Sequence, residues 1–167
     1  DTAFGGCSGF DSLKLPKGLK SIEGGAFADC KGFTGELAIP DSVTTIGKGA
    51  FSDCTGFTGD LIIPGSLTKV GDHAFENCNG FTGKLVISDG VDEIGVSTFE
   101  NCNGFKGKLV LADSVTKIGD YAFKDCSGFT GNLILPDSMT KIGDSAFKDC
   151  TGFSGELNIP DGVTTLY

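Results

Sequence analysis

One repeat runs through the whole chain and limits the folds that it can adopt. The cysteines are evenly spaced except that the first gap is one residue shorter than the other five, and they are Cys7, Cys30, Cys54, Cys78, Cys102, Cys126 and Cys150. All fourteen phenylalanines fall into two columns with this period, which begin at Phe4 and Phe10. A period of about 24 residues is typical of stacked β-coils and is too short for two-helix repeats of about 33 residues or more.

Each unit carries the signals of short strands and tight turns. Leu61-Ile62-Ile63 alternates in the way of a strand with one buried face, and Val43-Thr44-Thr45-Ile46 is rich in β-branched residues. Glycines at fixed positions mark corners between these segments. We therefore predict a mainly β solenoid with little helix, in which each strand pairs with its copy in the next coil. Residues 1–167 would form a single repeat domain of about six to seven coils, as a fragment of a longer chain.

The repeated motif resembles that of a known family. The pattern Leu-x-Ile-Pro-Asp-Ser-Val-Thr-x-Ile-Gly-x-x-Ala-Phe-x-x-Cys, seen from Leu37 to Cys54, is similar to the repeat of BspA-like leucine-rich repeat proteins. Relatives of the motif recur over the full chain. The resemblance implies a leucine-rich-repeat-like, right-handed solenoid that belongs to a cell-surface or secreted protein of a bacterium or a mucosal protist, often with an adhesive role.

Charge and hydropathy argue against nucleic-acid binding and against membrane insertion. The formal net charge is −9, and all 13 basic residues are lysines. Nucleic-acid recognition relies on clustered arginine and lysine, so we expect no nucleic-acid partner. No apolar run approaches the ~18–20 residues of a spanning helix, so we expect no membrane insertion.

The sequence lacks the parts of an active site. His73 is the only histidine, and it occupies a column that glycine, serine and tyrosine share, so we interpret it as a surface residue and not as a general base. Carboxylates such as Asp29 and Asp53 recur beside the cysteines, which is typical of turn formers. Paired catalytic carboxylates would occur once and not in every coil. We predict that the protein is not an enzyme and has no catalytic, cofactor-binding or metal-binding residues.

The cysteines are predicted to form a reduced, buried ladder of small apolar side chains. Each coil supplies one thiol without a nearby histidine, which argues against zinc. Stacked Cβ vectors would run parallel, which argues against disulfides between coils, although a disulfide, a metal ion or calcium between acidic coil edges remain alternatives.

A candidate interaction face lies at the strand position between the two inward aliphatic residues. Four successive coils place a large aliphatic residue there, and charged residues precede three of them; the candidate residues are Ile62, Val86, Val110, Ile134, Asp60, Lys84 and Lys108. Contiguous exposed apolar surface usually marks an interaction site. The alternative is that valine and isoleucine are simply favoured at half-exposed strand positions.

These observations favour a noncatalytic protein-binding or adhesion module, located extracellularly or at the cell surface. Its expected partner is a protein ligand such as a host surface or matrix protein, and self-association is a further expectation. The alternative is a structural spacer or a self-associating scaffold without a ligand of its own. A glycan-binding or hydrolytic role is the least favoured, because no coil carries a unique set of polar residues.

Overall fold

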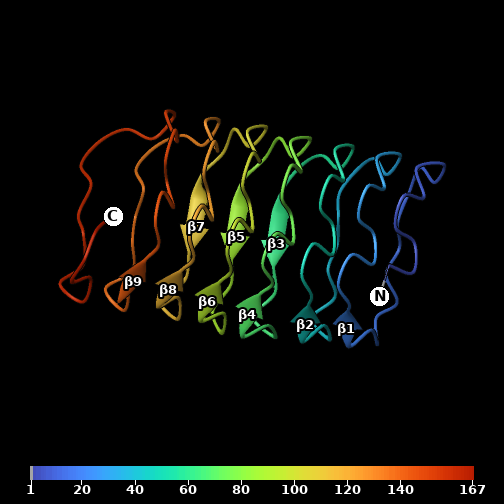
Figure 1. Cartoon of the computed structure of the whole chain (residues 1–167), viewed down its shortest axis with the longest axis horizontal. Helices are drawn as coiled ribbons and strands as arrows, with labels where there is room; N and C mark the ends of the chain where they lie inside the picture. Colours follow the sequence, from blue (N-terminus) through green and yellow to red (C-terminus); the bar gives the residue numbers. More distant parts are fainter. Residues whose placement is uncertain (1) are drawn as a thin grey trace.

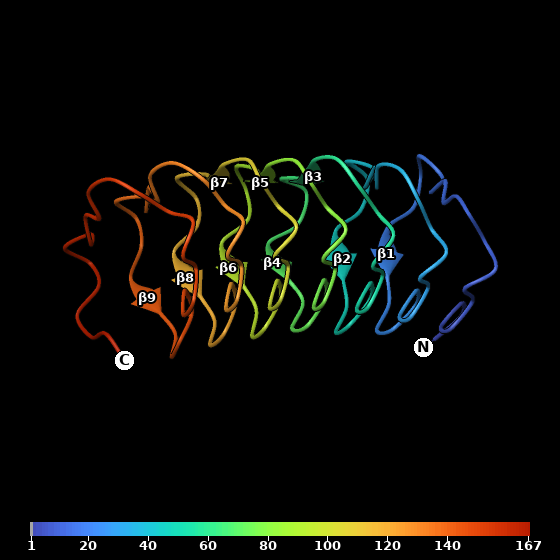
Figure 2. The same ribbon diagram turned by 90° about the horizontal axis from the view of Figure 1, so that it is seen from above.

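The computed structural model describes residues 2–167, and within this range it contains nine short strands and no helix. The coils stand side by side along one axis, with the two termini at opposite ends (Figures 1 and 2). The strands are β1 (Ser21–Ile22), β2 (Thr45–Ile46), β3 (Leu61–Ile63), β4 (Lys69–Val70), β5 (Leu85–Ile87), β6 (Glu93–Ile94), β7 (Leu109–Leu111), β8 (Lys117–Ile118) and β9 (Lys141–Ile142).

The strands form two parallel sheets that run along the length of the solenoid. One sheet has the order β1-β2-β4-β6-β8-β9, with one strand from each of six successive coils, and the other has the order β3-β5-β7. Every registered pair joins a residue to its copy in the next repeat, as for Leu61 with Leu85 and Ile22 with Ile46. The prediction of a mainly β, leucine-rich-repeat-like solenoid, with one repeat in each coil, is confirmed.

The core consists of like residues stacked on like residues. Phe75 is fully buried, and its ring centroid lies 5.3 Å from that of Phe51 and 5.4 Å from that of Phe99, with the rings nearly parallel. The second column stacks in the same way, and the two columns meet edge to face, as Phe51 does with Phe57 at 6.3 Å. Because each coil covers its neighbours' aromatic rings, the stack buries a continuous interior that a single coil could not form.

Close approach of neighbouring coils explains one glycine column. A Cβ on Gly80 would lie 2.2 Å from the carbonyl oxygen of Thr55 and 2.5 Å from that of Phe57. Both atoms belong to the backbone of the preceding coil and have little room to move. Only glycine therefore allows the coils to pack at this corner.

Two further columns adopt left-handed backbone conformations. Positive φ angles near 60° recur in the acidic and amide column beside the cysteines, at Asp29, Asp53, Asn77, Asn101, Asp125 and Asp149. These residues are turn formers as predicted, since aspartate and asparagine tolerate this region best. The column of His73 is also left-handed, with φ of 56° at His73 and 62° at Gly49. Its variable side chains therefore share a backbone constraint that the sequence did not reveal.

No helix within residues 2–167 is long and apolar enough to cross a membrane.

Candidate interaction face

The three-stranded sheet carries the aliphatic stripe that the sequence pattern predicts. Strand register places Ile62 beside Val86 and Val86 beside Val110, while the flanking leucine and isoleucine side chains point into the core. Ile62 and Val110 are 51% and 41% exposed, and Val86 is partly buried between them. Ile134 occupies the same place in the next coil and is 72% exposed. The four residues thus form an outward apolar stripe.

Lysines gather on one flank of this stripe, where the strands begin. Lys84 lies against Asp60 of the preceding coil: its backbone N–H donates to Oδ1 at 2.9 Å, and its Nζ lies 4.0 Å from Oδ2. Lys106 and Lys108 follow in the next coil, and both are exposed. The flank is therefore mixed in charge at its N-terminal side and basic over the coils of β5 and β7.

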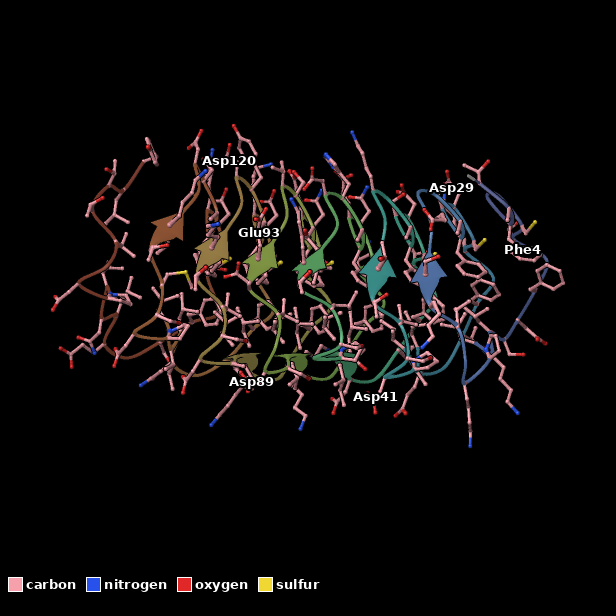
Figure 3. All side chains as sticks on the ribbon, turned by 90° about the horizontal axis from the view of Figure 1, so that it is seen from below. Phe4, Asp29, Asp41, Asp89, Glu93 and Asp120 are labelled. Carbon is pink, nitrogen blue, oxygen red and sulfur yellow. The ribbon has the colours of Figure 1, made fainter. Side chains whose placement is uncertain are left out.

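A row of aspartates marks the other flank, where the strands end. These exposed side chains lie two residues after the second inward aliphatic residue in five of six successive coils, Gly65 being the exception, and in the coils of β5 and β7 they follow the strand; the row comprises Asp41, Asp89, Asp113, Asp137 and Asp161. Figure 3 shows Asp41 and Asp89 on the side of the solenoid along which β3, β5 and β7 run. The candidate residues chosen from the sequence did not include this row. The sequence nevertheless contains the pattern that predicts this row, because aspartate recurs two positions after the second inward isoleucine or leucine.

The cysteines lie inside the solenoid and form no disulfide within residues 2–167. Cys30, Cys54, Cys78, Cys102 and Cys126 are buried, and Cys7 and Cys150 are partly buried. Each thiol from Cys30 onward donates a hydrogen bond of 3.0 Å to the carbonyl oxygen of a phenylalanine in the preceding coil, as Cys54 does to Phe27. They therefore act as polar donors as well as apolar packing groups.

Burial raises the pKa values of these thiols. The pKa of Cys54 and that of Cys150 are raised to about 12, and those of Cys78, Cys102 and Cys126 lie well above the ordinary value. Loss of hydration disfavours the thiolate, and neighbouring carboxylates and thiols add to the effect. Such thiols are poor nucleophiles and poor metal ligands at neutral pH. Within residues 2–167, no three side chains among the histidine, cysteine, aspartate and glutamate residues are grouped so as to hold a metal ion.

His73 lies at a turn away from the stripe and pairs locally. Its Nδ1 is 3.0 Å from Oε2 of Glu76, and a third of its side chain is exposed. A cavity of about 710 Å³ lies elsewhere, at the N-terminal end of the solenoid. Apolar side chains of the first coil, such as Phe4, Phe10 and Leu13, line it, with Lys14 and Glu23 as its charged members in the described chain. Neither place combines a nucleophile, a base and a cleft.

Comparison with known proteins supports the same architecture. The sequence model described as "BspA type Leucine rich repeat region" matches residues 1–106 and 105–167, with six copies. The crystal structure of a leucine-rich repeat protein from T. pallidum aligns with a TM-score of 0.60 and 26% identity over 86% of this chain. A leucine-rich repeat protein from Bacteroides ovatus aligns with a TM-score of 0.57 and 25% identity over 90% of it. This chain spans 60% and 49% of those two chains. No curated protein matches it.

Proposed function

Because this chain belongs to the BspA-type leucine-rich repeat family, we propose that it is a noncatalytic protein-binding or adhesion module, located extracellularly or at a cell surface. One observation carries the proposal: the aliphatic stripe of Ile62, Val86, Val110 and Ile134 lies outward on the three-stranded sheet, beside charged side chains. An exposed apolar strip with a charged rim is the usual composition of a protein interface. Candidate ligands include host surface and matrix proteins.

The experiment compares the wild-type chain with the double variant Val86→Thr/Val110→Thr. Threonine keeps the branched shape and the strand propensity of valine but removes part of the apolar surface. Each protein is immobilised, and binding of cultured epithelial cells and of purified laminin and collagen is measured. Val96→Thr is the matched control, because Val96 is 36% exposed and lies outside the strand face.

The proposal requires that wild type and the control bind one of these probes and that the double variant binds it at least several-fold more weakly. Equal binding by all three proteins would contradict a role for the stripe. It would favour the alternative, a structural spacer, in which valine and isoleucine at these positions reflect strand propensity alone. The uniform composition of the coils supports that alternative.

A further inference from the structure

We propose that a protein partner of the strand face is a second copy of this chain, docked face to face with its coils parallel and in register. This inference rests on the proposed function, since it names the partner of the same surface. The surface is the aliphatic stripe together with its two charged flanks, which we call the strand face.

The two flanks of the strand face carry opposite charges in the two central coils, those of β5 and β7. In the coil of β5, Lys84 precedes the strand and Asp89 follows it. In the coil of β7, Lys108 precedes the strand and Asp113 follows it. All four side chains are exposed. About five residues of extended chain separate each lysine from its aspartate, which is about 16 Å. A partner must therefore present the opposite order of charges on either side of an apolar centre.

A second copy presents that order in one of two symmetric arrangements. When the two-fold axis runs along the solenoid, the stripe of one copy faces the stripe of the other. The basic flank of each copy then lies opposite the acidic flank of its partner. Lys84 of one copy then faces Asp89 of the other, and Lys108 faces Asp113, because rotation about this axis leaves each coil at its own height. When the axis runs along the strands, basic flanks face basic flanks and acidic flanks face acidic ones. Charge complementarity in the coils of β5 and β7 thus favours the parallel arrangement.

The contact is expected to be weak. Four coils at about 4.8 Å each give a stripe about 19 Å long, so the face covers roughly 300 Å² in projection. This is about 600 Å² for the two copies together, which is below the ~1,200 Å² of a standard specific interface and typical of a weak, transient contact. Exposed ion pairs add little affinity and are screened by salt, and they act mainly on orientation. We therefore expect association only at high protein concentration and at moderate ionic strength, where salt screens the repulsion between two copies that each carry a net charge of −9.

Charge reversal tests this arrangement without altering the core. Analytical ultracentrifugation compares wild type with Lys84→Glu/Lys108→Glu and with Asp89→Lys/Asp113→Lys, up to about 1 mM protein and at about 0.15 M salt. We expect wild type to dimerise, each variant alone to remain monomeric, and an equimolar mixture of the two variants to form heterodimers, since their flanks are complementary. A wild type that stays monomeric, or a mixture that does not associate, overturns the inference.

Cross-linking tests the register. Ile62→Cys and Ile134→Cys each place a thiol on the stripe, and a bismaleimide of about 10 Å matches the spacing of packed sheets. In the parallel arrangement each variant alone gives cross-linked dimers. Dimers only from a mixture of the two variants would mean antiparallel docking and would overturn the proposed register. Thr45→Cys, on the other sheet, and wild type are the controls, because the native thiols are mostly buried.

The experiments distinguish failure of the dimer proposal from failure of the proposed function. If wild type is monomeric but still binds cells or matrix protein through Val86 and Val110, the second copy is not the partner and the binding role stands. If it dimerises as described and binds none of those probes, the inference stands and the adhesive role fails.

Discussion

The thiol of Cys102 donates a hydrogen bond to the carbonyl oxygen of Phe75, at 3.0 Å from Sγ to oxygen. The same oxygen accepts the backbone N–H of Cys78 in its own coil at 3.1 Å. One carbonyl thus ties the turn of its own coil to the side chain of the next. Repeated along the solenoid, this pair of bonds explains why a cysteine occupies a core position that a purely apolar residue of similar size could also fill.

The buried cysteines should be protected from reagents in the folded protein. With a maleimide at neutral pH, we expect Cys30, Cys54, Cys78, Cys102 and Cys126 to react very slowly, because they are buried and their thiolates are disfavoured. Cys7, which is partly buried, should react first, and Cys150 should follow more slowly, because burial raises its pKa to about 12. Mass spectrometry after labelling gives the sites. Seven labels after unfolding without a reductant are expected, and fewer would reveal disulfides.

The stability of the fold should decrease in alkali. The pKa of an unfolded thiol is near 9.0, whereas burial raises the pKa of Cys54 in the folded chain to about 12. Between these values the folded state binds more protons than the unfolded state. The free energy of unfolding must therefore fall as pH rises, by up to about 1.4 kcal/mol per pH unit for each such thiol.

Urea unfolding at pH 8, 9 and 10 measures this dependence, and Cys102→Ala is the informative comparison. Removing one buried thiol should make the pH dependence shallower by up to the contribution of one group. An unchanged slope would mean that Cys102 does not ionise on unfolding in this range.

Phe75→Ala should destabilise the solenoid by roughly 3–5 kcal/mol, because it removes a buried ring and leaves a cavity between two stacked neighbours. Phe4→Ala is a useful comparison, since Phe4 is 47% exposed and should cost much less. Denaturant titration of both variants measures the difference. Equal effects, or a cost below about 1 kcal/mol for Phe75→Ala, would show that this column does not form the core.

Val86→Thr/Val110→Thr should leave stability almost unchanged. The matched pair Val91→Thr/Val115→Thr should cost about 1–3 kcal/mol for each substitution, because both of these valines are fully buried and an added hydroxyl would lack a partner. Thermal and urea unfolding of the two double variants makes the comparison. Similar losses in both would place the stripe in the interior.

Gly80→Ala should destabilise the protein more than Gly18→Ala does. The new methyl group would meet backbone oxygens of the preceding coil at Gly80, whereas nothing lies within 4 Å of a Cβ at Gly18. Gly18→Ala is expected to be neutral or slightly stabilising, since alanine restricts the unfolded chain. Chemical denaturation of both variants tests this, and a tolerated Gly80→Ala would mean that the coils can separate at this corner.

Most of the fold could be predicted because identical residues recur at a constant spacing. Stacked coils must place Leu61 beside Leu85, and the observed register does so. The left-handed conformation at His73 could not be predicted. Two of the other coils have glycine at this position, which is compatible with a positive φ, but three others have serine or tyrosine, which do not indicate one. The bond from Cys102 to Phe75 was also missed, since these two residues lie farther apart in the chain than one repeat. The exposure of Ile62 and Val110 could be predicted, because side chains alternate between the two faces of a strand.

The register between neighbouring coils has a mechanical consequence. Each coil is held only by the coils before and after it, so a force applied to the two ends would detach coils one at a time from an end. A detached coil extends to about 80 Å, against the ~4.8 Å that it occupies in the stack. A chain of this kind would therefore lengthen in regular steps under tension and would keep its remaining coils intact.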